Sequence, residues 1–263
     1  MYLEFGQYFP GRSIIHTLDP RAKIGGLLLY SVALVLAPRF SVALEISLPL
    51  ILAAILAGVP GSFFWRQVKP LLPFLALALV FHAALTPGQE ILFTAGPFAF
   101  SREGAERAAL ACLRVAGLVL GAGMVTATTS PLRLTDGLEA ILKPARRLGL
   151  PVQEMALMLS LAVRFIPLLL EEAAKIRLAQ EARGADFSGR LEKRLKLFMA
   201  MAIPLFISIF RRAEDIAQAM EARCYRADKE RTRMHILRLR FNDYIALALG
   251  VFLLFWSAAR RWL

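Results

Sequence analysis

Residues Pro151–Arg226 read PVQEMALMLSLAVRFIPLLLEEAAKIRLAQEARGADFSGRLEKRLKLFMAMAIPLFISIFRRAEDIAQAMEARCYR, and this stretch decides the fold. It contains two long helical patterns, each apolar in its first half and charged in its second half. The triplet Glu-Ala-Arg closes both patterns, at residues 181–183 and again at residues 221–223. Recurrence inside one chain indicates that a structural unit is used twice. We therefore expect two helices that present Arg183 and Arg223 at matching ends, held by the rest of the chain.

The composition indicates that the rest of the chain is a membrane anchor. Hydrophobic residues make up 57% of the sequence and the mean hydropathy is +0.56, above the apolar content of soluble domains. The net charge of +12 is typical of cytoplasmic loops that face anionic lipid. No aromatic-basic interleaving or zinc-finger spacing favours nucleic acid as a partner. The two cysteines, Cys112 and Cys224, are far apart and give neither a disulfide framework nor a metal site.

Five apolar runs predict an all-α membrane protein with about five transmembrane helices. Between the third and fourth runs, residues 86–100 alternate turn and β-like residues, which predicts a small hairpin or irregular loop. Small residues in the fourth helix, at Gly117, Gly121 and Gly123, allow close packing in lipid. The predicted spans are Ile24–Ala37, Val42–Val59, Leu71–Leu85, a helix from about residue 102 to Thr129, and Tyr244–Ala259. We expect no cleavable signal peptide in the residues before the first run.

The distribution of basic residues predicts the orientation. Residues 133–240 contain 21 Lys and Arg against 13 Asp and Glu, and the positive-inside rule places such a segment in the cytoplasm. The N-terminus and a loop carrying Arg66 and Lys69 are then also cytoplasmic. The terminal pair Arg260-Arg261 would lie outside, against the rule. We expect three domains: a membrane domain at residues 1–130, a cytoplasmic module of long helices at 131–240, and a C-terminal transmembrane helix at 241–263.

The long patterns follow a short predicted helix, Leu132–Leu148. Each covers about 33 residues, or ~50 Å of helix, with a kink expected at Pro167. That length exceeds the ~30 Å hydrocarbon core, while each apolar half is too short to cross it comfortably. We therefore expect long helices that lie beneath the spans, and the alternative is a helical hairpin that crosses the membrane.

Two interpretations exist for Arg183 and Arg223. An arginine in the last turn complements the helix dipole, a contribution of ~0.3–1 kcal/mol. This explains one such residue, but not the same triplet twice with an alanine before each arginine. A guanidinium at a slim helix tip is suited to dock into an acidic or carbonyl-lined groove of a partner.

With its two arginine motifs, the chain resembles the transmembrane T component of energy-coupling factor transporters, a family that includes the cobalt-transport permease. The resemblance covers nearly the whole length, and the opening residues and length are more similar to the shared type of T component than to the cobalt-dedicated type. The matching motifs are Phe5–Gly11, Leu18-Asp19-Pro20-Arg21-Ala22-Lys23, Arg164-Phe165-Ile166-Pro167, Gln180–Gly184 and Ala219–Arg226.

The resemblance implies that the two arginine motifs end crossed coupling helices, each docking in one of two ATP-binding-cassette ATPases. The residues carried over are Ala182, Arg183 and Gly184 for the first motif and Ala222, Arg223 and Cys224 for the second, where Cys224 replaces the glycine of the family. A separate small membrane protein, the substrate-capture S component, would bind the vitamin or metal ion. The apolar residues that we expect to face it are Met155, Leu159, Met199, Met201 and Phe206.

The chain has no Gly-x-x-x-x-Gly-Lys-Ser/Thr loop, so we expect ATP to bind only to the partner ATPases and no cofactor to bind to the chain directly. An intramembrane enzyme is the alternative from another class, but His16, His82 and His235 lie on different segments and form no catalytic motif. A self-contained transporter is the third interpretation, and it would need more polar residues at mid-membrane. Glu45 and Arg114 are the charged residues inside the predicted spans, and we expect both to serve in helix packing.

Overall fold

The computed structural model describes residues 8–11, 13–85, 91–95, 98–185, 191–226 and 237–262, with only the backbone described for 83–85, 91–95, 98–102, 191–194 and 196. The chain forms two compact units. The first, here called the bundle, consists of Met1–Ile141 and Leu237–Leu263; the second, the long-helix unit, consists of Leu142–Ile236.

The bundle is built from helices joined by short connections, with one β-hairpin. Its helices are α1 (Ile14–Thr17), α2 (Pro20–Leu36), α3 (Phe40–Ala57), α4 (Gly61–Val68), α5 (Leu72–Leu85), α6 (Arg102–Thr128), α7 (Pro131–Leu142) and α10 (Phe241–Trp262). Strands β1 (Ile91–Ala95) and β2 (Phe98–Ser101) pair antiparallel between α5 and α6. This confirms the hairpin predicted there, of which residues 86–90, 96 and 97 lie outside the description.

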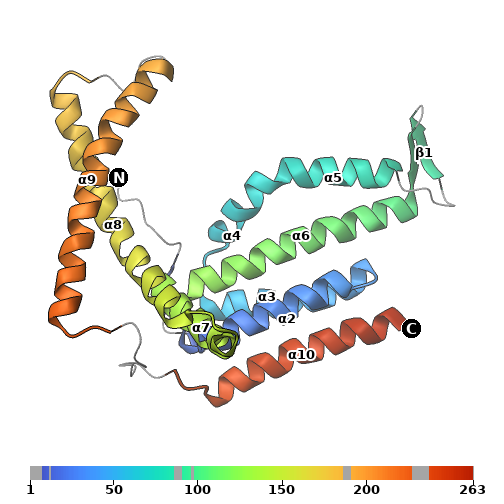
Figure 1. Cartoon of the computed structure of the whole chain (residues 1–263). Coiled ribbons are helices and arrows are strands. Elements are labelled where there is room, and N and C mark those ends of the chain that lie inside the picture. Colours follow the sequence, from blue (N-terminus) through green and yellow to red (C-terminus); the bar gives the residue numbers. More distant parts are fainter. Residues whose placement is uncertain are drawn as a thin grey trace. The chain divides into compact units, whose positions relative to one another are not determined.

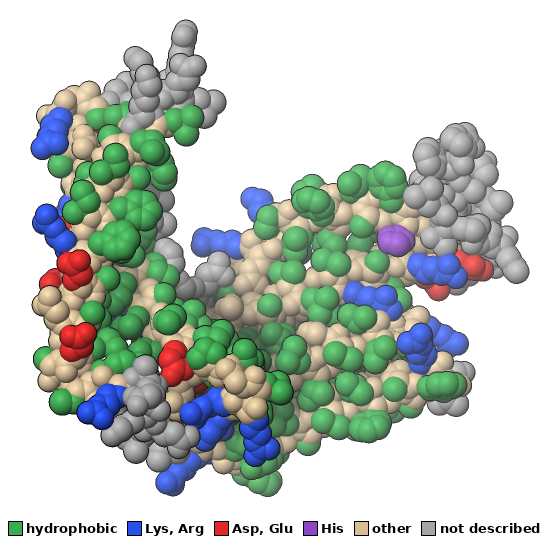
Figure 2. Space-filling model, in the orientation of Figure 1, with side chains coloured by type: hydrophobic (Ala, Val, Ile, Leu, Met, Phe, Trp, Pro, Cys, Tyr) green, Lys and Arg blue, Asp and Glu red, His purple; other side chains and the backbone are tan. Residues whose placement is uncertain are grey.

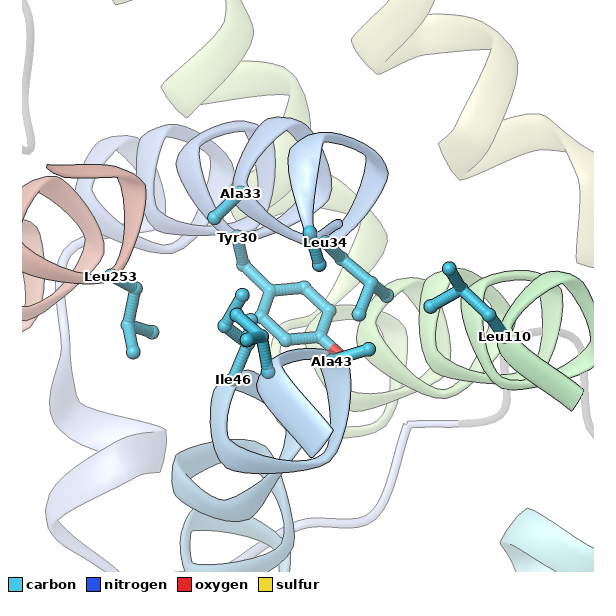
Figure 3. Close-up of a cluster of buried hydrophobic side chains, with 9 residues drawn as sticks. Tyr30, Ala33, Leu34, Ala43, Ile46, Leu110 and Leu253 are labelled. Atoms are coloured by element: carbon cyan, nitrogen blue, oxygen red, sulfur yellow. The ribbon is translucent and has the colours of Figure 1, made fainter. Parts of the chain in front are cut away.

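Helix α2 lies at the centre of the bundle. It packs along α10, α6 and α3, and α5 packs on α6; in Figure 1 these five helices run side by side. Gly117 and Gly121 of α6 face Tyr30 of α2, so closely that a Cβ on Gly117 would lie 2.7 Å from a methyl carbon of Leu34. The small residues therefore permit the close packing that the sequence predicts. Figure 3 shows the resulting core, formed by Tyr30, Ala33 and Leu34 of α2 with Ala43, Ile46, Leu110 and Leu253.

The surface of the bundle is largely apolar. Figure 2 shows hydrophobic side chains over its outward face and charged side chains near its ends. Many large apolar residues of α3, α5 and α10 are exposed, far beyond the apolar patches of a soluble monomer. Such a surface requires lipid around it, as expected for an all-α membrane protein.

Within the described residues, five helical runs are long and apolar enough to cross a membrane, namely α3, Gly61–His82, α6, α8 and α10. Four of them agree with predicted spans. The remaining predicted span, Ile24–Ala37, corresponds to α2, whose 17 residues extend ~25 Å and fall short of the ~30 Å hydrocarbon core. Helix α8 (Val152–Ala182) has the length and composition of a span, which was the alternative arrangement for the long patterns.

The predicted loop around Arg66 and Lys69 is wrong. Arg66 lies in α4, and Lys69 begins a 3₁₀ turn that continues directly into α5. The helix packs on α6 by one face: Phe63 is buried in a cluster with Met124 and Ala127 of α6, while Ser62, Trp65 and Arg66 are exposed.

The long-helix unit contains α8 and α9 (Leu191–Ala222), which pack against each other and cross (Figure 1). Pro167 lies inside α8 and Pro204 inside α9. The short helix predicted at Leu132–Leu148 is divided into α7 and a 3₁₀ segment, Lys143–Leu148, that ends at Gly149. Pro144 explains this division because proline cannot donate the hydrogen bond that would continue an α-helix.

Candidate functional site

Helix α8 ends in a complete Schellman motif built on the first Arg motif. The N–H of Gly184 donates to Glu181 O at 2.9 Å, and the N–H of Ala185 donates to Gln180 O at 3.0 Å. Gly184 has φ +86°, the left-handed conformation that this motif needs and that glycine adopts without a steric penalty. The motif turns the chain sharply after Arg183, so the arginine stands at the tip of the helix.

Helix α9 ends with the same hydrogen bonds although its motif lacks the glycine. The N–H of Cys224 donates to Glu221 O at 2.8 Å, and the N–H of Tyr225 donates to Met220 O at 3.0 Å. Cys224 has φ +58° and is the one non-glycine residue with a positive φ in the described part of the chain. The departure from the family pattern at Cys224 therefore leaves the helix-ending geometry intact.

Both arginines are exposed, together with the residues on either side of them: Ala182, Gly184, Ala222 and Cys224. Neither guanidinium forms a hydrogen bond or ion pair with another described residue. The nearest ion pair in α8 joins Arg177 Nε to Glu181 Oε1 at 2.8 Å and leaves Arg183 out. Each guanidinium thus keeps its five donors and its charge available to a partner.

The C-terminal ends of α8 and α9 lie at opposite ends of the crossed pair (Figure 1). The structure therefore does not bring the two motifs together into one pocket; it presents them as two separate tips. Exposed alanines lie along each helix before its tip: Ala174 and Ala182 in α8, and Ala213 and Ala217 in α9. Two helix tips of matching geometry at separate places suit two copies of a partner, or two related partners, better than one ligand.

The residues predicted to face a capture subunit lie on α8 and α9, and most of them are exposed. Met155, Leu159, Met199 and Phe206 are exposed, whereas Met201 is half-buried. On an α-helix Met201 is offset by about 160° from Met199 and by about 140° from Phe206, which explains why it does not share their surface. The partial burial of Met201 does not support its predicted place in an interface with a capture subunit.

Met199 and Phe206 belong to a larger surface that the sequence reasoning missed. Seven large apolar side chains, each at least half exposed, follow one face of α9: Leu195, Phe198, Met199, Ile203, Phe206, Ile207 and Phe210. We call them the α9 stripe. Their spacing by three and four residues is the signal of an amphipathic helix, and a count along that period would have found the other five.

The intramembrane charges have partners within the bundle. Trp256 Nε1 of α10 donates to Glu45 Oε2 of α3 at 2.8 Å. Arg114 Nη2 of α6 donates to Ala37 O, at the C-terminal end of α2, at 2.6 Å. Both charges thus connect helices, as a packing role requires.

The histidines do not come together in the described residues. His16 is buried, its Nε2 lies 2.9 Å from Phe9 O and its Nδ1 lies 2.7 Å from Ser13 Oγ, contacts that hold the segment before α2. His82 lies on α5, and His235 is outside the described residues. No group of three His, Cys, Asp or Glu side chains within the described ranges is arranged to hold a metal ion.

Comparison with known proteins gives a consistent result over nearly the whole chain. The family model described as cobalt transport protein matches residues 11–236. Proteins named energy-coupling factor transporter transmembrane protein EcfT are similar along most of their length. The protein of Heliobacterium modesticaldum is 45% identical over 255 residues, covering 96% of both chains. That of Acidaminococcus fermentans is 44% identical over 259 residues with the same coverage, and that of Listeria innocua is 40% identical over 255 residues, covering 95% of this chain and 96% of its own.

Proposed function

Since the chain belongs to the cobalt transport protein family and is a T component of the energy-coupling factor type, we propose that it couples two ATP-binding-cassette ATPases to a substrate-capture subunit in the membrane. The imported substrate would be a micronutrient, either a vitamin or a metal ion, bound by the capture subunit. The chain itself would neither hydrolyse ATP nor bind a cofactor.

The observation that carries this proposal is the duplicated helix end. Two helices finish with the same pair of hydrogen bonds and present an exposed arginine with no partner among the described residues. Two such tips at opposite ends of a crossed pair fit two ATPase subunits, one at Arg183 and one at Arg223. ATP binding would bring the ATPases together and move both tips with their helices, which is the two-state element that coupling requires.

The α9 stripe supports the second half of the proposal. A continuous exposed apolar face on a helix needs an apolar partner, either lipid or protein. Met199 and Phe206 would contact the capture subunit there, with Met155 and Leu159 of α8 adding to the surface. Methionine and phenylalanine offer an adaptable contact that tolerates sliding.

The proposed location is a bacterial cytoplasmic membrane, with the N-terminus and the long-helix unit in the cytoplasm. The excess of basic residues between residues 133 and 240 supports this orientation through the positive-inside rule. The bilayer and both kinds of protein partner would then contact different surfaces of one chain.

The test is co-purification of the chain with its ATPases in detergent. We compare the wild type with Arg183→Glu, Arg223→Glu and the double variant. Charge reversal at a docking arginine that becomes desolvated should cost several kcal/mol, so each single change should deplete the ATPases and the double change should remove them.

Arg211→Glu is the matched control, because Arg211 is also an exposed arginine of α9 but lies three turns before its end. This control should retain the ATPases at the wild-type level. Equal recovery of the ATPases by the wild type and the double variant would exclude docking at the two tips.

A further inference from the structure

A single buried carboxylate joins the starts of two helices in the bundle. Asp243 is 1% exposed. Its Oδ1 accepts from the N–H of Asp19 at 2.7 Å and its Oδ2 from the N–H of Arg240 at 2.6 Å. Asp19 directly precedes α2 and Arg240 directly precedes α10. Helix starts carry N–H groups without intrahelical partners and a partial positive charge. Asp243 accepts the N–H that precedes each helix and brings a negative charge to both starts, while Asp19 Oδ1 accepts from the N–H of Arg21 at 2.9 Å.

A buried ammonium joins the same end of α2 to the end of α6. Lys23 is 8% exposed, and its Nζ donates to Thr128 O and Thr129 Oγ1, both at 2.9 Å. Thr128 Oγ1 lies further away at 3.4 Å. The last carbonyls of a helix are unsatisfied and carry partial negative charge, so a lysine is the complementary group at this place. We call Asp19, Lys23, Thr128, Thr129 and Asp243 the polar anchor.

Helix α7 is fixed to the same turn of α2. Gly137 of α7 lies so close to Pro20 that a Cβ on the glycine would be 2.7 Å from the Cβ of Pro20 and 3.3 Å from its carbonyl carbon. Pro131, the first residue of α7, follows Thr129 of the anchor by two positions. The first turn of α2 thus contacts α7, α6 and the start of α10.

The polar anchor lies next to the two covalent connections between the bundle and the long-helix unit. The long-helix unit begins at Leu142, where α7 ends, and the chain returns to the bundle at Leu237, three residues before Arg240. Both covalent connections of that unit therefore leave the bundle from elements held by the anchor. Buried charges are weak evidence for stability, but hydrogen-bonded charges define one geometry, and a junction that transmits movement needs one geometry.

We propose that the polar anchor is the positioning device of the two junctions. The anchor holds α7 and the start of α10 against α2. Movement of α8 and α9 is therefore transmitted to the bundle and is not absorbed by flexibility of the two connections. Lys23 and Asp243 are its positioning residues. This inference rests on the proposed function, because it assumes that the ATPases move the long helices.

The test measures how widely the distance between the bundle and α9 varies in the purified complex with its ATPases. Spin labels are placed on two exposed residues, through Arg39→Cys in the bundle and Gln218→Cys in α9, after Cys112→Ser and Cys224→Gly remove the native thiols. Cys224→Gly gives α9 the residue that α8 has at the equivalent place, and this background must first retain the ATPases at the wild-type level. Pulsed electron resonance then gives the distance distribution with ADP and with ATP. Lys23→Met and Asp243→Asn should broaden the distribution at least twofold and abolish its shift with ATP, while ATPase co-purification remains.

Ser257→Ala is the matched control. Ser257 is fully buried and donates to Ala33 O at 2.8 Å, so it also joins α10 to α2, but away from both junctions. It should keep the wild-type width and shift even where it lowers the melting temperature. If Lys23→Met and Asp243→Asn behave like Ser257→Ala, the inference is overturned.

Two further outcomes are decisive. If the unsubstituted complex fails to retain the ATPases, the proposed function fails before the anchor is tested. If Lys23→Met does not accumulate, Thr129→Val removes one acceptor of Lys23 at nearly constant volume; it should broaden the distribution in the same direction, and an unchanged width would reject the anchor.

Discussion

Cys224 adopts the backbone conformation that Gly184 adopts at the equivalent place in α8. A side-chain-bearing residue in this region is disfavoured by roughly 1–2 kcal/mol, and glycine loses part of that advantage through its more flexible unfolded state. We therefore expect Cys224→Gly to stabilise the end of α9 by about 0.5–1 kcal/mol and Gly184→Ala to destabilise the end of α8 by about 1 kcal/mol. Hydrogen exchange of the Tyr225 and Ala185 amides, which close the two motifs, measures these changes.

Gly61→Ala is a suitable control for this pair. Gly61 has an ordinary φ and open space around the position of a Cβ, so the substitution should leave exchange at both helix ends unchanged. An Ala185 amide that exchanges equally fast in wild type and Gly184→Ala would show that the turn does not depend on glycine.

The residue-scale features differ in how far the sequence predicts them. The recurrence of Glu-Ala-Arg predicts matched helix ends, because the same short motif favours the same cap. The conformation of Cys224 is not predictable in this way, since cysteine reaches the left-handed region only when the surrounding hydrogen bonds hold it there. The polar anchor was missed because Asp19 and Asp243 are 224 residues apart, and each alone looks like a capping residue at the edge of an apolar run.

At the scale of single elements, the α9 stripe leads to a prediction for the capture subunit. Phe206→Ala removes a large aromatic side chain from the middle of the stripe. If the stripe is the interface, this residue is at its centre, where truncation of an aromatic anchor costs ~2 kcal/mol, or about thirtyfold in affinity. Co-purification of the capture subunit, titrated in detergent, should weaken by that factor while the ATPases remain bound.

Leu178→Ala provides the comparison. Leu178 is 64% exposed and Phe206 60%, but Leu178 lies in the charged half of α8, outside the stripe. It should leave both partners bound. Equal loss of the capture subunit in the two variants would mean that exposed apolar area, wherever it lies, holds the complex together.

Apolar runs predicted most of the helices well because burial in lipid leaves a signal that is local in sequence. Their boundaries and exceptions depend on packing that no single run contains. Helix α4 was predicted as a loop because Arg66 and Lys69 stand between two apolar runs, although Phe63 packs on α6. The stripe was found only in part, since Met199 and Phe206 were selected by type and not by their place on the helix.

At the scale of the whole molecule, the native thiols test the orientation in the membrane. Cys224 is exposed and Cys112 is half-buried in α6. If the long-helix unit is cytoplasmic, a membrane-impermeant maleimide should label Cys224 in inside-out vesicles and not in intact cells. Labelling is measured by the mass increase of the purified protein.

Bound ATPases should protect Cys224, because it follows the docking residue Arg223 directly. We expect the labelling rate in inside-out vesicles to fall at least tenfold when the ATPases are co-expressed. A Cys224→Ser variant reports any reaction at Cys112. Labelling of Cys224 in intact cells would reverse the proposed orientation.

The bond between Asp19 and Asp243 also sets an order of events during synthesis. Helix α2 is among the first segments to leave the ribosome, and α10 is the last. At ~5–20 residues per second, the 224 residues that separate the two partners take roughly 10–45 s to translate. During that interval the N–H of Asp19 lacks the carboxylate of Asp243, and Lys23 lacks its acceptors until the end of α6 emerges. Helix α2 is therefore inserted early but gains its last hydrogen bond only when α10 is made. A chain that ends before α10 would lack this bond, and we expect membrane proteases to degrade it faster.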